Sequence, residues 1–74
     1  MSGPVKRSIT IAGHRTSVSL EPVFWTLLTE AAEAEGKSIG GLVTSIDEGR
    51  AANLSSAIRT WLVERLRSQV AWAA

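Results

Sequence analysis

The chemically useful side chains of this sequence are basic and hydroxyl groups, not nucleophiles or metal ligands. The chain has no cysteine and a single histidine, His14, which excludes thiol catalysis, disulfides and a zinc-thiolate centre. Residues 1–20 contain Lys6, Arg7 and Arg15 and no acidic residue, whereas the following thirty are net acidic. A basic segment of this kind can contact phosphate, although three basic residues are also within the ordinary variation of charge along a protein sequence. Charge alone therefore leaves a polyanion partner open.

Two short motifs imitate known sites but lack the context that those sites require. Gly36-Lys37-Ser38 has the letters that end a phosphate-binding loop, but Ala31 stands where the loop needs its first glycine, and a helix is predicted where a strand is required. Asn53-Leu54-Ser55 fits a glycosylation sequon, but no export signal is predicted for the chain. Because no catalytic or metal-binding constellation remains, we predict that the protein is not an enzyme and uses no cofactor or metal.

Size and hydropathy predict one small domain. The chain has 74 residues, of which 45% are hydrophobic, and a core of this size is marginal without a disulfide, a metal or a second chain. No apolar run is long enough for a membrane span or a signal peptide. We therefore expect a soluble cytoplasmic protein that has no membrane partner and is supported by oligomerisation.

Residues 6–20 alternate between polar and apolar side chains, which predicts strands at Ser8–Ile11 and Arg15–Leu20. The intervening Ala12-Gly13-His14 can turn the chain, so a hairpin is possible. The predicted organisation is a flexible lead at 1–5, a domain at 6–69 and a tail at 70–74.

The rest of the chain has the 3.6-residue periodicity of amphipathic helices. This spacing predicts helices at 22–35 and 39–48 and a third, capped by Asn53 or Ser55, that reaches about Gln69. Gly36 is predicted to end the first helix and Ser38 to cap the second. One strand and two helices cannot close a core alone, and the second strand has an edge that needs a partner. A second chain would satisfy both needs.

Several of these patterns occur together in a fixed order. They are the alternating Arg15–Leu20, the helix start Glu21-Pro22, the link Gly36-Lys37-Ser38, the wider pattern Ser8–Glu21 followed by Trp25, and Asn53–Arg59. Together they resemble the ribbon-helix-helix family, most closely a bacterial subgroup with an extra N-terminal strand and a third C-terminal helix. The resemblance covers roughly residues 7–67. It implies a mainly α fold with a short β-ribbon, built as an intertwined homodimer with an added C-terminal helix.

The resemblance also implies a function, namely a sequence-specific DNA-binding transcriptional regulator whose dimeric antiparallel ribbon enters the major groove of double-stranded DNA. Carried over residue by residue, Arg15, Ser17 and Ser19 would contact base edges, and Arg15 would be the strong reader because arginine bonds guanine bidentately. Lys37 and Ser38 would contact a backbone phosphate at the start of the second helix. The implied dimer core comprises Val18, Leu20, Phe24, Leu27, Leu42, Ile46 and Trp61.

The first strand complicates insertion into the groove. A two-stranded ribbon fits a major groove about 12 Å wide, but a hairpin in each chain would give four strands and roughly 14 Å between outer backbones. Either the N-terminal segment is an arm whose Lys6 and Arg7 follow the DNA phosphates, or the dimer is kept without DNA reading. The alternative function is therefore a protein-interaction module. An antitoxin-like protein would need a disordered tail, which the well-patterned third helix does not suggest.

Overall fold

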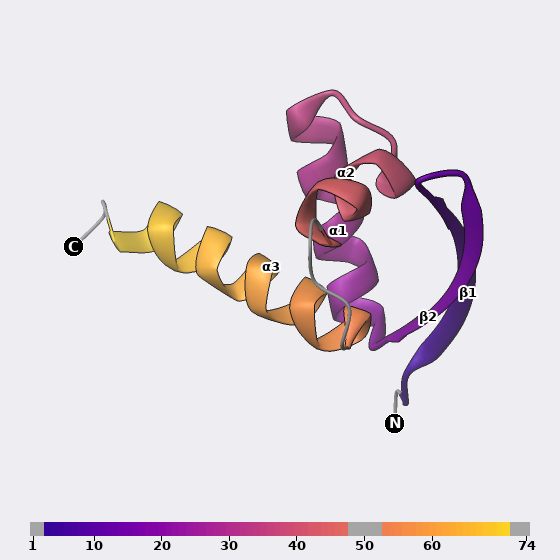
Figure 1. Ribbon diagram of the computed structural model, residues 1–74. Coiled ribbons are helices and arrows are strands. Elements are labelled where there is room, and N and C mark those ends of the chain that lie inside the picture. The colour runs from indigo at the N-terminus through magenta and orange to yellow at the C-terminus, as the bar shows by residue number, and fades with distance from the viewer. Residues whose placement is uncertain (1–2, 48–52, 72–74) are drawn as a thin grey trace.

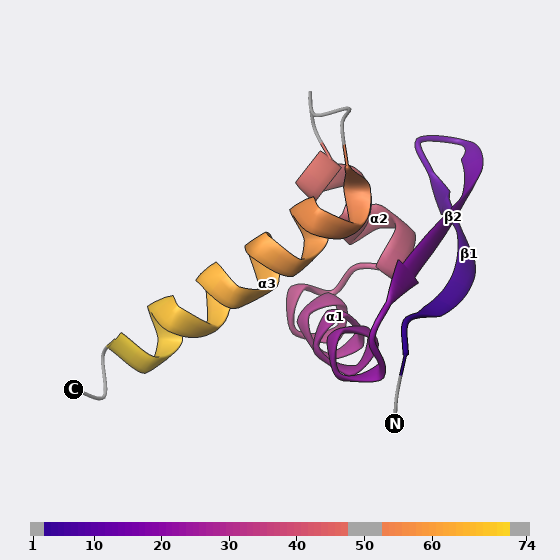
Figure 2. The ribbon, with the colours of Figure 1, turned by 90° about the horizontal axis from the view of Figure 1, so that it is seen from below.

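Two strands and three helices make up the protein, whose computed structural model describes residues 3–47 and 53–71. In chain order they are β1 (Val5–Ile11), β2 (His14–Leu20), α1 (Pro22–Glu35), α2 (Ile39–Asp47) and α3 (Leu54–Ala71). The hairpin of β1 and β2 curves along one side of the helices, and α3 extends away from it (Figures 1 and 2). No helix among the described residues is both long enough and apolar enough to cross a membrane.

The observed elements follow the predicted ones closely, with shifts at their ends. β1 begins at Val5, inside the predicted lead, and α3 continues two residues beyond the predicted Gln69. The predicted last residue of the second helix, Glu48, lies outside the described residues. Residues 49–52, which join the predicted second and third helices, also lie outside the described residues, as do the first two residues and the tail beyond residue 71.

β1 and β2 pair in antiparallel fashion over their whole length, from Val5 opposite Leu20 to Ile11 opposite His14. The two turn residues, Ala12 and Gly13, have φ angles of 52° and 83°. Positive φ at both positions is the type I′ geometry, whose twist matches that of the flanking strands. The hairpin is thus confirmed, and the alternative of a free N-terminal arm is wrong for residues 5–11.

Two hydrogen bonds hold the ends of the hairpin against the helices. At the open end, the indole Nε1 of Trp25 donates to the Val5 carbonyl at 2.9 Å. At the turn, the Ala12 N–H donates to Oγ1 of Thr44 on α2 at 3.3 Å. β1 is therefore fixed to the body of the protein at both ends, which explains why it does not form an arm.

Gly40 allows α2 to approach the hairpin closely. A Cβ built at this position would overlap the carbonyl oxygen of Thr10 on β1. Glycine costs a helix interior about 1 kcal/mol relative to alanine, so the close contact with β1 is what requires it here. The beginning of α2 therefore lies directly beside the turn end of β1.

The ends of the helices are set by local hydrogen bonds. Gly36 follows α1 in the left-handed region at φ 69°, as predicted. The Gly41 N–H donates to Oγ of Ser38 at 3.0 Å, which confirms the predicted cap of α2. Of the two candidates for the third helix, Asn53 is the cap, because its Oδ1 accepts the Ser56 N–H at 3.1 Å.

The core closes within one chain. Trp25 is its largest buried side chain. The large side chains under 2% exposed come from all the elements but β1, namely Val18, Leu20, Leu28, Leu42, Val43, Ile58 and Leu62. Ile58 and Leu62 belong to α3, which covers the space that a strand and two helices would leave open. The third helix therefore supplies core side chains for which the sequence interpretation invoked a second chain, and the dimer itself stays a prediction.

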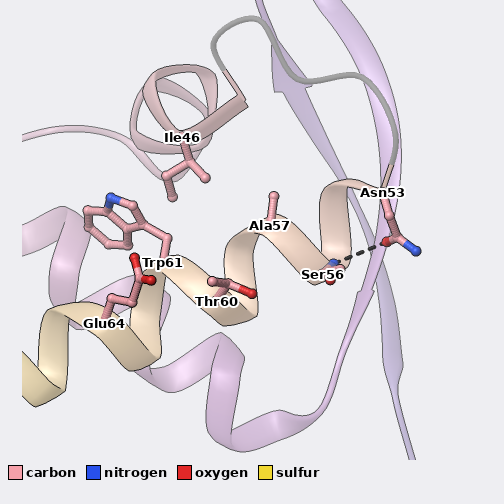
Figure 3. Close-up of a pocket in the computed structure, with 7 residues that line it drawn as sticks. All are labelled: Ile46, Asn53, Ser56, Ala57, Thr60, Trp61 and Glu64. Atoms are coloured by element: carbon pink, nitrogen blue, oxygen red, sulfur yellow. Dashed lines mark hydrogen bonds between the residues drawn. The ribbon is translucent and has the colours of Figure 1, made fainter.

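The residues predicted for a dimer core fall into two groups. Val18, Leu20 and Leu42 are buried inside the chain. The other four, Phe24, Leu27, Ile46 and Trp61, pack against the core but are only partly buried. Ile46 and Trp61 line one hollow between α2 and α3 (Figure 3). These four side chains leave apolar surface on the outside of the chain.

Candidate nucleic-acid interface

The face of the hairpin that points away from the helices carries only hydroxyl and basic side chains. Residues directly opposite each other in an antiparallel pair share one face, and successive residues alternate between faces. Val18 and Leu20 are buried against the helices. The cross-strand pairs that alternate with theirs along the hairpin therefore point outward. These outward pairs, here called the outer face, are Lys6 with Ser19, Ser8 with Ser17 and Thr10 with Arg15.

The three predicted base-contacting residues lie together on the outer face. Arg15, Ser17 and Ser19 form one row along β2, in which neighbours two residues apart are separated by about 6.8 Å. Arg15 and Ser17 are exposed, and Ser19 is half-buried. β1 adds Ser8 and Thr10 beside them, which the sequence interpretation did not include. The signal was present, since a two-residue turn sets the register that pairs these hydroxyls with β2.

The predicted phosphate contacts of β1 lie on opposite faces. Lys6 lies on the outer face opposite Ser19. Arg7 faces the helices, and its guanidinium carbon lies 5.1 Å from the centre of the Trp25 ring. Such a cation–π contact contributes about 0.5–1 kcal/mol at an exposed site. Lys6 is therefore available to the outer surface, whereas Arg7 braces β1 against α1.

The other predicted phosphate contacts, Lys37 and Ser38, lie at the start of α2. The Ser38 hydroxyl already accepts the Gly41 N–H, and the Lys37 Nζ is 3.5 Å from the Ser45 hydroxyl. Gly40 brings this helix end against Thr10, the cross-strand partner of Arg15. The structure therefore brings the positive end of α2 to the end of the outer face that carries Arg15.

The outer edge of β2 is partly free. A two-residue turn makes Ile11 and His14 a hydrogen-bonded pair, and bonded and non-bonded pairs then alternate, so the peptide groups of Arg15, Ser17 and Ser19 point away from β1. The Ser19 carbonyl accepts a bond of 3.5 Å from Nη2 of Arg59 on α3. Among the described residues, no hydrogen bond is made to the edge at Arg15 and Ser17.

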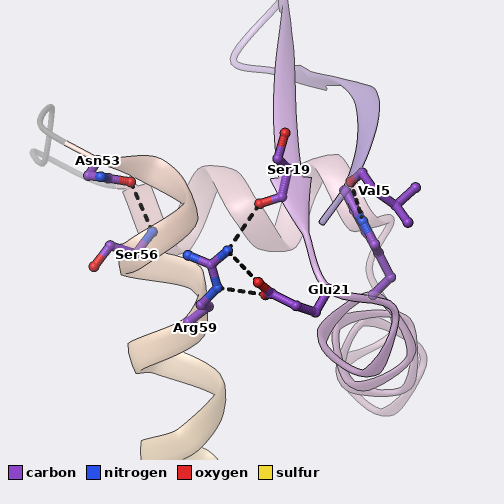
Figure 4. Close-up of polar contacts among 7 residues, drawn as sticks. Val5, Ser19, Glu21, Asn53, Ser56 and Arg59 are labelled. Carbon is purple, nitrogen blue, oxygen red and sulfur yellow. Dashed lines mark hydrogen bonds and ion pairs between the residues drawn. The ribbon is translucent and has the colours of Figure 1, made fainter. Parts of the chain in front are cut away.

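Arg59 also fastens α3 to the junction between β2 and α1. Its Nε lies 2.9 Å from Oε1 of Glu21, and its Nη2 lies 3.3 Å from Oε2 (Figure 4). The hydrogen bond from Arg59 holds the pKa of the Glu21 carboxyl below its ordinary value, with a smaller contribution from a backbone hydrogen bond. This pair was not predicted, because no local pattern connects residues so far apart in the chain.

Comparison with known families agrees with this architecture. A family model described as a ribbon-helix-helix domain matches residues 4–66. The chain belongs to the ribbon-helix-helix family. The match begins just before β1 and ends within α3, so the extra strand and most of the third helix lie within the ribbon-helix-helix domain. The predicted ribbon and its helices are confirmed, and the intertwined homodimer stays a prediction. The ribbon is a hairpin within one copy, whereas the resemblance implied one strand from each of two chains.

A solved structure is similar to this ribbon-helix-helix protein over nearly its whole length. It is that of an uncharacterized protein from Bordetella pertussis Tohama I, which is 34% identical, with a TM-score of 0.69 over 95% of this chain. The chain spans 58% of the length of that protein. No curated protein matches the chain.

Proposed function

We propose that this protein is a dimeric, sequence-specific binder of double-stranded DNA that regulates transcription in the cytoplasm, and that it contacts DNA through the outer face of the hairpin. The observation that carries the proposal is the composition of that face, where two basic and four hydroxyl side chains point outward with no acidic or apolar residue among them. Arginine bonds guanine bidentately, and hydroxyl groups bond several bases. Arg15 is therefore the main source of sequence preference.

The proposed dimer pairs β2 with β2 of a second copy. An antiparallel pairing with Ser17 opposite its counterpart would place Arg15 opposite Ser19 of the other copy and use the peptide groups that β1 leaves free. The Ser19 carbonyl has two lone pairs and can accept from Arg59 and from a partner strand together. The partly buried Ile46 and Trp61 offer apolar surface for the second copy to cover.

The four-stranded sheet of this dimer is wider than a flat ribbon, so its fit to the groove depends on its twist and its bend. The hairpin is concave toward the helices, so the outer face is convex (Figure 1). Strands in a sheet also twist by about 20–25° relative to each neighbour. In the proposed complex the two central β2 strands bring Arg15 toward the bases, and the flanking β1 strands bring Lys6 toward the phosphates.

The test measures binding by fluorescence anisotropy, with duplexes selected from a random pool near 0.15 M salt. Arg15→Ala is expected to cost about 1–3 kcal/mol on the selected duplex and to relax the choice of base at one position. Lys37→Ala is expected to weaken all duplexes alike and to make the slope of log affinity against log salt shallower by about one per contact, hence by about two for the dimer. Arg67→Ala removes an exposed cation from α3 and serves as the control, with affinity near that of the wild type.

The proposal fails if Arg15→Ala and Lys37→Ala both bind like the wild type, or if no duplex binds above the nonspecific level. In either case the protein-interaction module replaces DNA reading as the function of this dimer.

A further inference from the structure

A groove of about 570 Å³ runs between β1 and α1. Val5 and Arg7 line its strand side, and Trp25, Thr26, Glu30 and Glu33 are among the residues that line its helix side. We call it the β1–α1 groove. It is a different surface from the outer face, because Arg7 belongs to the side of the hairpin that faces the helices.

The β1–α1 groove lies beside the edge of β1 that β2 does not occupy. α3 lies against the other flank of α1, where the guanidinium carbon of Arg59 is 5.9 Å from the centre of the Phe24 ring. Arg59 also donates a hydrogen bond to the Ser19 carbonyl on β2. Trp25, on the near flank, bonds the Val5 carbonyl on β1. The α1 residues that follow Trp25 around the helix, such as Thr26, therefore lie beyond β1 on the side away from β2.

The adjoining edge of β1 has unpaired peptide groups. By the same alternation that frees the β2 edge, the N–H and C=O groups of Lys6, Ser8 and Thr10 point away from β2. Gly40 of α2 closes this edge at Thr10. Lys6 and Ser8 make no edge hydrogen bond among the described residues. An edge of this kind is a template for an added strand.

The charge of the groove selects its occupant. Glu30 and Glu33 are exposed and have no ion-pair partner among the described residues. Arg7 is the cation on the strand side, and it is stacked on Trp25. Two carboxylates against one guanidinium make the groove net acidic, which disfavours nucleic acid and favours a basic chain.

We propose that the β1–α1 groove binds an extended basic segment of a partner protein by strand addition. The segment's backbone bonds the free peptide groups of Lys6 and Ser8, and its Lys or Arg side chains at alternate positions face Glu30 and Glu33. Alternate side chains of the bound strand would be about 6.8 Å apart, and Glu30 and Glu33 are about 4.5 Å apart along the helix axis. Flexible Lys or Arg side chains can cover this difference of about 2 Å. A second copy of β1 is a poor occupant, because two-fold pairing would bring like-charged α1 walls together.

The test uses a labelled peptide in which lysine alternates with valine and measures its binding to the full chain by fluorescence anisotropy. Two control peptides carry glutamate in place of lysine, or N-methyl groups on alternate amides. The double variant Glu30→Gln with Glu33→Gln is expected to weaken binding by up to about fivefold per carboxylate. Glu35→Gln, which changes an exposed acid of α1 outside the groove lining, is the matched variant and should bind like the wild type.

Backbone pairing has its own readout. The Lys6 and Ser8 amides should exchange with solvent more slowly when the lysine peptide is bound, and the N-methylated peptide should lose both the binding and this protection. Equal binding of the glutamate peptide, unchanged exchange at both amides, or undiminished binding of the double variant would each overturn the proposal. The result is independent of DNA binding, because no residue changed in this test lies on the outer face.

Discussion

Gly40→Ala tests how closely α2 must approach the hairpin. The added Cβ overlaps the carbonyl oxygen of Thr10, a backbone atom that cannot rotate away, so α2 has to move off β1. Overpacking of this kind costs about 1–3 kcal/mol, while alanine contributes about 1 kcal/mol of helix propensity. Because the neighbour is backbone, we expect the free energy of unfolding to fall by about 1–2 kcal/mol. The Ala12 amide, which bonds Thr44 on α2, should also exchange faster.

Gly41→Ala is the matched control, one residue further along the same helix. Its Cβ would lie 3.1 Å from Oγ of Ser38, which is side chain and not backbone, so a shift of a few tenths of an ångström relieves the contact at some cost to the cap. We expect this variant to range from neutral to about 1 kcal/mol more stable than the wild type. Urea denaturation should therefore separate the two variants by about 2 kcal/mol. A Gly40→Ala protein as stable as the wild type would refute the close-contact argument.

The remaining predictions concern the turn, the ion pair and the dimer. Ala12→Asn is expected to raise the free energy of unfolding by about 0.5–1 kcal/mol, because asparagine tolerates the left-handed region better than alanine; an unchanged urea midpoint would contradict this. The pKa of Glu21 is lower in the folded protein than in the unfolded chain, which stabilises the fold. This stabilisation is present at a pH above the unfolded-state pKa and is lost as the pH falls through the folded-state pKa. The free energies of unfolding of the wild type and Arg59→Gln, measured as a function of pH, should therefore differ above that pH window and converge below it. For the proposed dimer, the thermal midpoint should rise with protein concentration, and Trp61→Ala should weaken association. A folded monomer at micromolar concentration in sedimentation would count against the dimer.

Local sequence patterns located the elements because helix and turn ends depend on neighbouring residues. Gly36 supplies the left-handed residue after α1, and Ser38 supplies the hydroxyl that caps α2. The alternation of 15–20 separated the buried Val18 from the exposed Ser17, because strand side chains point to opposite faces in turn. The predicted row of base-contacting residues therefore coincides with one face of the observed hairpin.

The position of Arg7 shows where these local patterns stopped being sufficient. Its charge and its place next to Lys6 suggested a common phosphate contact, but pairing within the hairpin puts the two on opposite faces. Once the hairpin is known, its register places Lys6 and Arg7 on opposite faces. The sequence left the choice between a hairpin and an arm open, because that choice depends on Trp25 reaching the Val5 carbonyl.

By itself, the sequence determined the order of the elements, the Gly36 end of α1, the Ser38 cap of α2 and the polar outer row of β2. Each of these depends on the conformational preferences and hydrogen bonds of residues close together in the chain. The tertiary structure decided that α3 completes the core, that Gly40 brings α2 against Thr10, and that Arg59 fastens α3 to Glu21. Gly40 and Thr10 lie 30 positions apart in the chain, and Arg59 and Glu21 lie 38 apart. Their formation depends on how whole helices and strands pack against one another, which no local periodicity encodes.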